Sequence, residues 1–353
     1  MTAKGDAKLY NINLPAGVYL QAQLTTPANA DLDYDLYLLD AEGNILTGSD
    51  YYTYINGTAG TLPEALGYIT SGDTATYYLY VLASEGGSVS ESFTLDYSVS
   101  TACDSYEIDE SVRQALAFTY GAGGAYIESR NLSSPIDNDW YVITVPSSRI
   151  YDKLKISATT ASTNTCSVEV YQNVASEGYQ MKRVGSGNTI SVSSGKYYIR
   201  VSNAKTMENF DDLDIQNYKL SITPILKATG IVITDLKGSE GLNKVVNYPG
   251  YGAHFRTQGS GTLTVYGVLT ATDSSTGVTY AVGGEQINGL YYSPAWEANN
   301  TSANAIRRGT GTTDSSGKFE IDISLPPGIG VYSYYGSTSV SYTHLRAHET
   351  VLD

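Results

Sequence analysis

The sequence predicts an all-β protein built from three consecutive β-sandwich domains. Short runs in which apolar and polar residues alternate recur along the chain, and such runs are typical of strands with one buried face. The 353 residues include 35 glycines and 10 prolines, enough turn-forming residues to separate many strands. Tyrosine occurs 32 times, against 5 phenylalanines and 2 tryptophans, and it suits thin sheets with one partly hydrated face. No stretch indicates a helix of any length.

The first domain is expected over residues 1–98. Its clearest element is residues 31–44, where a strand with alternating side chains leads into a turn at Gly43 and Asn44. One side of this strand carries Leu32, Tyr34, Leu36 and Leu38, and the other carries Asp31, Asp33 and Asp35, which we expect to form an exposed face. Further strands are expected at residues 8–15, 18–24, 76–81 and 93–97.

The second domain, expected over residues 104–224, repeats the pattern of the first. Residues 139–146 match residues 8–15 in their tyrosine, isoleucine and proline positions, and residues 196–201 match residues 76–81. Strands expected at residues 154–158, 167–171 and 217–222 follow in the order of the first domain. Because several strands recur in one order, we infer a duplicated domain.

The third domain, expected over residues 228–339, has a different pattern. Strands are expected at residues 230–234, 261–270, 278–282, 318–324 and 330–335, and two of the hairpin loops between strands end in Gly277 and Gly317. Residues 313–319 resemble a hairpin of Ig-like or transthyretin-like surface modules, so we expect an Ig-like sandwich that is truncated at its C-terminus. Residues 340–353 resemble a translated sequencing adaptor and are expected to be unstructured.

Four pieces of the first two domains carry a resemblance to a known family. They are Asp137–Tyr141, Asp33–Asn44, Gly195–Val201 and Tyr218–Ile222. These pieces resemble the bacterial pre-peptidase C-terminal (PPC) domain. The stretch Asp104–Ser111 resembles the acidic segment of that family, with Ile108 and Asp109 where the family usually has proline and asparagine. The resemblance implies two jelly-roll-like sandwiches, carried as accessory modules on large secreted bacterial proteins that are often peptidases.

The first copy of this domain lacks the acidic segment. It begins at the equivalent of residues 137–141, so we expect the natural protein to start upstream of Met1. The absence of a signal peptide from this sequence is therefore uninformative about export.

Five carboxylates of the second domain are the candidate metal ligands: Glu107, Asp109, Glu110, Asp137 and Asp139. The PPC resemblance places their two segments together, and relatives with this acidic segment use such carboxylates to bind calcium. Hard oxygen ligands in this number suit Ca²⁺. The alternative is a solvated acidic junction without an ion. In the first domain half of the site is absent, and no calcium is expected there.

Composition excludes some partners and leaves the redox state open. The formal net charge of −15 disfavours nucleic acid and anionic membranes. No apolar run approaches the ~20 residues that a membrane span needs, and we expect a monomer without membrane insertion. The two cysteines, Cys103 and Cys166, are compatible with a disulfide or with two buried free thiols.

The sequence contains no recognisable catalytic constellation, so we expect no enzyme activity. Neither G-x-S-x-G nor H-E-x-x-H occurs, and His254 is the one histidine outside the adaptor-like tail. A set of aromatic residues is a candidate for stacking on sugar or peptide, although tyrosine is also ordinary filler in sandwiches. The set is Tyr51, Tyr52, Tyr54, Tyr291, Tyr292, Trp296, Tyr332, Tyr334 and Tyr335.

Together these patterns predict a non-catalytic segment of a large secreted or cell-surface bacterial protein, with spacer, stabilising or adhesive modules. One alternative is a module that binds collagen-like peptide, another extracellular matrix protein, or polysaccharide. A second alternative is the accessory region of a secreted peptidase whose catalytic domain lies outside this chain.

Overall fold

The structure is a computed structural model of the chain. It describes residues 1–27, 29, 31–50, 52–55, 58–59, 63–101, 103–160, 166–174, 180–203, 216–238, 242–248, 252–257, 261–291, 307–325, 330–332 and 345–346, and in β5, β6, β20, β21, β27 and β28 it describes the backbone alone. Within these residues the protein is all-β, without a helix, and forms several sheets, which confirms the predicted fold class. The chain divides into two compact units, residues 1–147 with 153–225, and residues 148–152 with 226–353.

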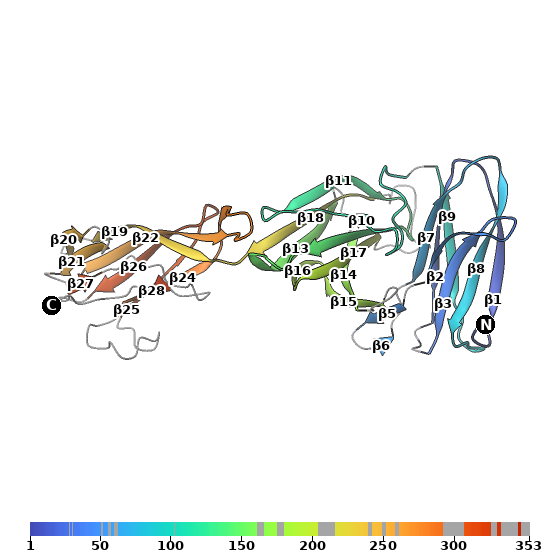
Figure 1. Cartoon of the computed structure of the whole chain (residues 1–353), viewed down its shortest axis with the longest axis horizontal. Coiled ribbons are helices and arrows are strands. Elements are labelled where there is room, and N and C mark those ends of the chain that lie inside the picture. Colours follow the sequence, from blue (N-terminus) through green and yellow to red (C-terminus); the bar gives the residue numbers. More distant parts are fainter. Residues whose placement is uncertain are drawn as a thin grey trace. The chain divides into compact units, whose positions relative to one another are not determined.

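The first sandwich of the first unit packs a four-stranded sheet against a three-stranded one (Figure 1). The larger sheet has the order β1 (Ala7–Leu14), β8 (Ala75–Glu85), β3 (Asp33–Leu39) and β4 (Ile45–Ser49). The smaller has the order β7 (Glu64–Ile69), β2 (Tyr19–Thr25) and β9 (Thr94–Ser100). The predicted apolar side of β3 is buried between them, together with Leu20 and Leu24 of β2. Alternation along each strand therefore sets which face meets the core.

The acidic side of β3 is not the exposed face that the sequence suggested. Asp31 is exposed, but Asp35 is buried and accepts a hydrogen bond from the Tyr37 hydroxyl at 3.2 Å. The reason is that neighbouring side chains on the same face, Tyr37 of β3 and Ser84 of the adjacent β8, contact the Asp35 carboxylate through hydrogen bonds. Burial raises the pKa of Asp35, and burial with the nearby Asp35 raises the pKa of Asp33 to about 6.

The second sandwich has a larger and a smaller sheet as well. The larger has the order β10 (Leu116–Ala117), β12 (Asn138–Val145), β17 (Gly195–Asn203), β14 (Cys166–Asn173) and β15 (Gln180–Ser186), and it is extended by β5 (Tyr52–Ile55) and β6 (Thr58–Ala59). The smaller has the order β11 (Ala125–Leu132), β18 (Gln216–Leu226), β13 (Tyr151–Thr160) and β16 (Asn188–Ser191). Strand β5 comes from the first part of the chain and pairs in parallel with β15, so the two sandwiches share a sheet.

The two sandwiches agree in strand order and in register. The order β1-β8-β3-β4 in the first corresponds to β12-β17-β14-β15 in the second, and β7-β2-β9 corresponds to β16-β13-β18. Lys8 lies opposite Val81 in the first sandwich, and Asp139 lies opposite Val201 in the second. Lys8 is therefore the counterpart of Asp139, as expected for the duplication inferred from the sequence.

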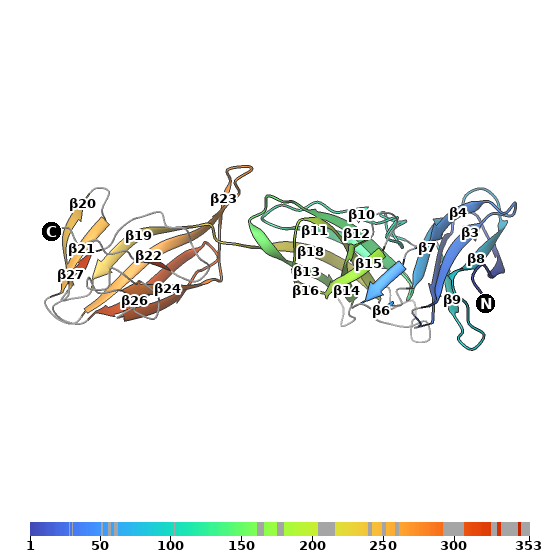
Figure 2. The ribbon, with the colours of Figure 1, turned by 60° about the horizontal axis from the view of Figure 1, so that its bottom comes forward.

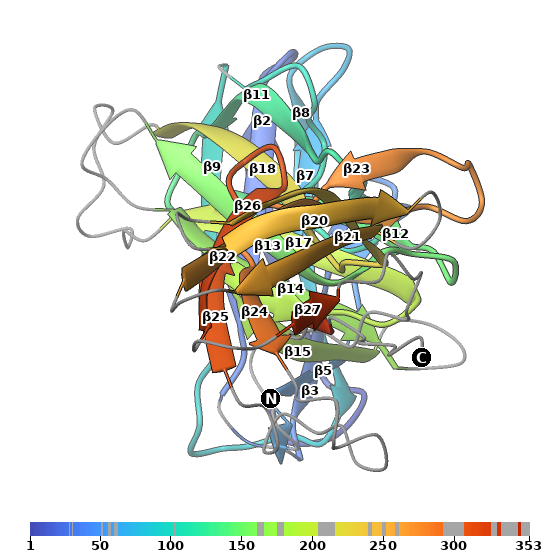
Figure 3. The ribbon, with the colours of Figure 1, turned by 90° about the vertical axis from the view of Figure 1, so that its left-hand side faces the viewer.

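In the part of the second unit that the structure describes, there are three sheets. One holds β19 (Gly230–Gly238), β22 (Gly261–Thr272), β23 (Thr279–Ala281) and β26 (Lys318–Leu325), with β22 between β19 and β26 (Figure 2). Another holds β20 (Leu242–Tyr248), β21 (Gly252–Thr257) and β27 (Gly330–Tyr332), and its strands are at the front in Figure 3. The third holds β25 (Arg307–Thr312), β24 (Gln286–Tyr291) and β28 (Leu345–Arg346). Gly277 and Gly317 have positive φ, as the predicted hairpin loops require.

Some predictions lie outside the described residues. These include the side chains of the whole aromatic set and of His254, and residues 340–353 apart from the backbone of Leu345–Arg346. The boundary expected between the second and third domains lies close to the division of the two units at Ile225. The boundary between the first two domains stays a prediction, since both sandwiches belong to one unit.

Candidate metal centre

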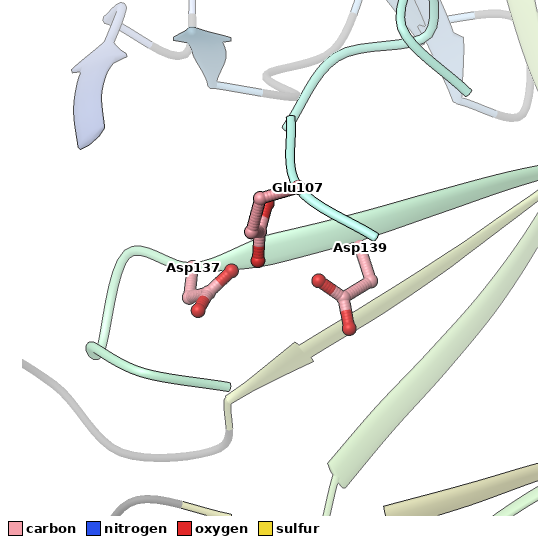
Figure 4. A group of neighbouring side chains, drawn as sticks. All are labelled: Glu107, Asp137 and Asp139. Carbon is pink, nitrogen blue, oxygen red and sulfur yellow. The ribbon is translucent and has the colours of Figure 1, made fainter. Parts of the chain in front are cut away.

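All five sequence-predicted carboxylates meet at one place in the second sandwich. Glu107, Asp137 and Asp139 form one group, and Glu107, Asp109 and Glu110 form another that shares Glu107. In each group one carboxylate oxygen per residue lies within 4.8 Å of the others. Figure 4 shows the carboxylates of the first group turned toward one another.

Local backbone structure explains this gathering. Asp137 and Asp139 flank Asn138, the first residue of β12, and in extended chain such residues project to the same side. The acidic segment is fixed beside β12 because the Trp140 N–H donates to the Asp109 carbonyl oxygen at 2.9 Å. The glutamates of that segment therefore face the start of β12.

The cluster is almost completely buried. Asp109, Glu110, Asp137 and Asp139 are each at most 1% exposed. Each residue of the cluster has one oxygen that accepts no hydrogen bond, namely Glu107 Oε1, Asp109 Oδ1, Glu110 Oε2, Asp137 Oδ1 and Asp139 Oδ1. A buried acceptor left unsatisfied costs about 1–3 kcal/mol, and a charged one costs more. The cluster thus has a strong need for a cation or for protons.

The other oxygen of most of these carboxylates is held by the protein. Asp137 Oδ2 accepts from the Ser133 N–H and hydroxyl, and Asp139 Oδ2 accepts from the Tyr218 hydroxyl. Glu107 Oε2 accepts from the Tyr19 hydroxyl at 2.8 Å, and Glu110 Oε1 accepts from Gln21 Nε2 at 3.2 Å. Hydrogen bonds of this kind orient the ligands of a metal site.

Arg130 of β11 is a member of the cluster that the sequence analysis missed. Its guanidinium is fully buried and forms ion pairs with Asp104, Asp109 and Asp139, the last at 3.0 Å to the otherwise unpartnered Oδ1. Its Nε donates to the Tyr141 hydroxyl at 2.7 Å. Two of the five candidate ligands, Asp109 and Asp139, are therefore paired with this guanidinium, together with Asp104.

The electrostatics follow from burial. Burial, with Asp137 and Asp104 adding, raises the pKa of Glu107 to about 8. Burial also raises the pKa values of Asp109, Glu110 and Asp139 well above the usual range, and raises that of Asp137. For Arg130, burial lowers the pKa, but Asp139 and Asp109 outweigh it and the pKa rises. Burial thus disfavours the ionised form of these carboxylates, and a divalent cation would compensate their negative charge.

The donor set fits a hard cation. Calcium takes six to eight oxygen ligands at 2.3–2.6 Å, so two oxygens on one ion are at most about 5 Å apart. The spacing within 4.8 Å in each group satisfies this limit. Each group consists of carboxylates alone, without nitrogen or sulfur, which favours calcium over zinc. In the first sandwich, Lys8 stands in place of Asp139, and a lysine there disfavours a cation.

The two cysteines are free thiols in the structure. Burial raises the pKa of the Cys166 thiol to about 12, and burial with Glu107 raises that of Cys103. Both thiols are thus poor nucleophiles at neutral pH.

Fold and site together define the class: an all-β, multi-domain sandwich protein with a buried carboxylate cluster in one sandwich. No family model matches the chain. A stretch of 47 residues is 43% identical to the uncharacterized protein YlqB of Bacillus subtilis (strain 168). That match covers 13% of this chain and 29% of YlqB, so it spans less than a third of the relative's length. The described residues form no helix that is long and apolar enough to cross a membrane.

Proposed function

We propose that the second sandwich binds calcium through Glu107, Asp109, Glu110, Asp137 and Asp139, and that the ion stabilises a non-catalytic module. The observation that carries the proposal is that each of the five carboxylates has a buried oxygen that accepts no hydrogen bond, although Asp139 Oδ1 forms an ion pair with Arg130. The proposal extends to the whole chain as a spacer, stabilising or adhesive segment of a large secreted or cell-surface bacterial protein. The resemblance of residues 5–224 to PPC domains supports this part of it.

Calcium suits this site better than magnesium does. Magnesium demands near-ideal octahedral geometry at 2.0–2.1 Å and usually keeps several waters, whereas calcium accepts irregular cages of carboxylates. A site that is at most 1% exposed at four of its five carboxylates offers little room for such waters. Extracellular modules bind calcium at about 10⁻⁴–10⁻³ M, so export would supply enough of the ion.

Burial also favours a structural role for the ion over a catalytic one. A catalytic metal keeps an open coordination position that a substrate can reach. Here the carboxylates lie beneath the acidic segment and face one another, with Asp137 and Asp139 not exposed at all. The ion would therefore hold two chain segments together, as spacer and adhesive modules require.

Melting of the full chain with calcium and with chelator tests the proposal. An ion that binds the folded state raises the melting temperature. At a hundredfold excess over Kd it adds about 2.7 kcal/mol to the free energy of unfolding. Terbium, a luminescent substitute for calcium, should be sensitised by Trp140 next to Asp139 and released by added calcium. Glu107→Gln, which removes the residue common to both groups, should abolish both signals, while the matched control Asp152→Asn at an exposed position should preserve them. No melting shift at millimolar calcium would refute calcium binding.

A further inference from the structure

We propose that the first sandwich is part of the metal centre, so that calcium binding and docking of the two sandwiches are coupled. This inference rests on the calcium binding proposed above. It adds that one face of the first sandwich, formed by Tyr19, Gln21 and Gln23 of β2 and by Gly67 of β7, positions the acidic segment for the ion. We call these four residues the docking face.

The docking face is the side of the β7-β2-β9 sheet that points away from its own core. Leu20, Ala22 and Leu24 of β2 belong to that core, and the residues between them project to the opposite side. Such a polar face is normally hydrated, yet Tyr19 is only 2% exposed and Gln21 only 1%. Polar groups must therefore cover the docking face, and the hydrogen bonds show that they belong to the second sandwich.

The docking face contacts both chain segments of the metal centre. On the acidic segment, Tyr19 and Gln21 donate to Glu107 Oε2 and Glu110 Oε1. At the start of β12, Asn138 Nδ2 donates to Gln23 Oε1 at 3.3 Å. Each glutamate is thus held through one oxygen by the first sandwich, while Glu107 Oε1 and Glu110 Oε2 accept no hydrogen bond. The first sandwich thereby fixes the orientation of two ligands.

Gly67 lets the acidic segment approach the sheet closely. It pairs with Gln21, and a Cβ at this position would overlap the Glu110 carboxylate and stand 2.6 Å from Ile108 Cγ2. All three nearest atoms belong to residues 108 and 110, not to the first sandwich itself. An alanine here would fit the strand and obstruct the docking.

Charge contributes to the coupling. Glu110 is only 1% exposed beside the docking face, and burying carboxylates without a compensating cation is unfavourable. A bound calcium ion supplies that charge, and the docked face in turn orients the ligands. By linkage, any factor that docking contributes to calcium affinity is the factor by which calcium favours docking.

The test measures calcium affinity of the full chain in four variants. Tyr19→Phe removes the hydroxyl that orients Glu107, and Gly67→Ala blocks the approach of Glu110. Residues that orient metal ligands contribute about 10- to 100-fold to affinity, so both substitutions should weaken calcium binding at least tenfold. Tyr97→Phe, in the same sheet and 50% exposed, and Gly123→Ala, whose Cβ would meet open space, are the matched controls and should bind as the wild type does. Hydrogen exchange should show that calcium protects residues 107–111 and the docking face in the wild type but not in Gly67→Ala.

A purely structural role is separated by melting in chelator. There Tyr19→Phe should melt within a degree or two of Tyr97→Phe, because the ion whose ligand Tyr19 orients is absent from both. Wild-type calcium affinity in both Tyr19→Phe and Gly67→Ala would overturn the inference and leave the proposed calcium site standing. A wild type that binds no calcium would overturn both.

Discussion

Replacing Asp137 with asparagine should change stability in opposite directions with and without calcium. Asp137 is fully buried, and its Oδ2 accepts from Ser133 while its Oδ1 accepts no hydrogen bond. Asparagine keeps one acceptor oxygen for Ser133 and places an amide donor where the unpartnered oxygen was. That donor faces Glu107 and Asp139, so the amide removes one negative charge and gains a hydrogen-bond partner.

The magnitudes follow from these contacts. In chelator, removing an unsatisfied buried acceptor should raise the free energy of unfolding by about 1–3 kcal/mol. In calcium, loss of an anionic ligand should weaken binding by about 10- to 100-fold, which is about 1.4–2.7 kcal/mol. Asp137→Asn should therefore melt above the wild type in chelator, and its calcium-induced shift should be smaller.

Urea unfolding of the full chain, monitored by tryptophan fluorescence in calcium and in chelator, measures both effects. The exposed Asp152→Asn should change neither value by more than about 0.5 kcal/mol. Destabilisation of Asp137→Asn in chelator, or a wild-type calcium shift, would show that Asp137 does not face a cation site.

Three further substitutions test packing and charge in the two sandwiches. Asp33→Asn should stabilise the first sandwich by about 1 kcal/mol near pH 7 and hardly at all near pH 4. Because the pKa of Asp33 is raised to about 6 in the folded protein, the stability of the wild type is full below the unfolded pKa of 3.8 and is lost as pH rises through 6. Partial exposure of Asp33 reduces the effect below the full linkage value. Urea melts at both pH values check this, with the exposed Asp31→Asn as the control. Arg130→Met should lower the free energy of unfolding by about 3 kcal/mol in chelator, because it leaves three carboxylates without their buried cation, and a loss below 1 kcal/mol would contradict this role. Gly48→Ala should lower the melting temperature, since its Cβ would overlap the Tyr37 ring, at a cost of about 1–3 kcal/mol.

Strand positions were predictable because each strand carries its own two-residue period. The apolar side of residues 32–38 and the turn after it needed no knowledge of the rest of the chain. The candidate ligands were found through a family resemblance, which placed the acidic segment beside residues 137–139. Burial of Asp35 was not predictable in this way, because the position of a strand within its sheet depends on residues far away in the sequence.

The partners of the cluster were not predictable for the same reason. Arg130 stands in a polar run of β11, and nothing in that run distinguishes it from a surface arginine. Tyr19 and Gln21 occupy the side of β2 opposite the core, which by alternation alone predicts solvent exposure. Their burial arises only when a second sandwich covers the sheet, and the period of one strand carries no signal for that.

Comparison of the two copies shows how burial changes the electrostatics of the same local structure. By register, Asp6 is the counterpart of Asp137, and it accepts from the N–H and hydroxyl of Thr2 as Asp137 does from Ser133. In its solvent-accessible loop, hydrogen bonds from Thr2 lower the pKa of Asp6, whereas burial raises the pKa of Asp137. The outer residues of β1 are exposed where those of β12 are buried beneath the acidic segment. The same hydrogen-bonded loop is therefore accessible to solvent in the first copy and buried in the second. The acidic segment, which the first copy lacks, causes this difference.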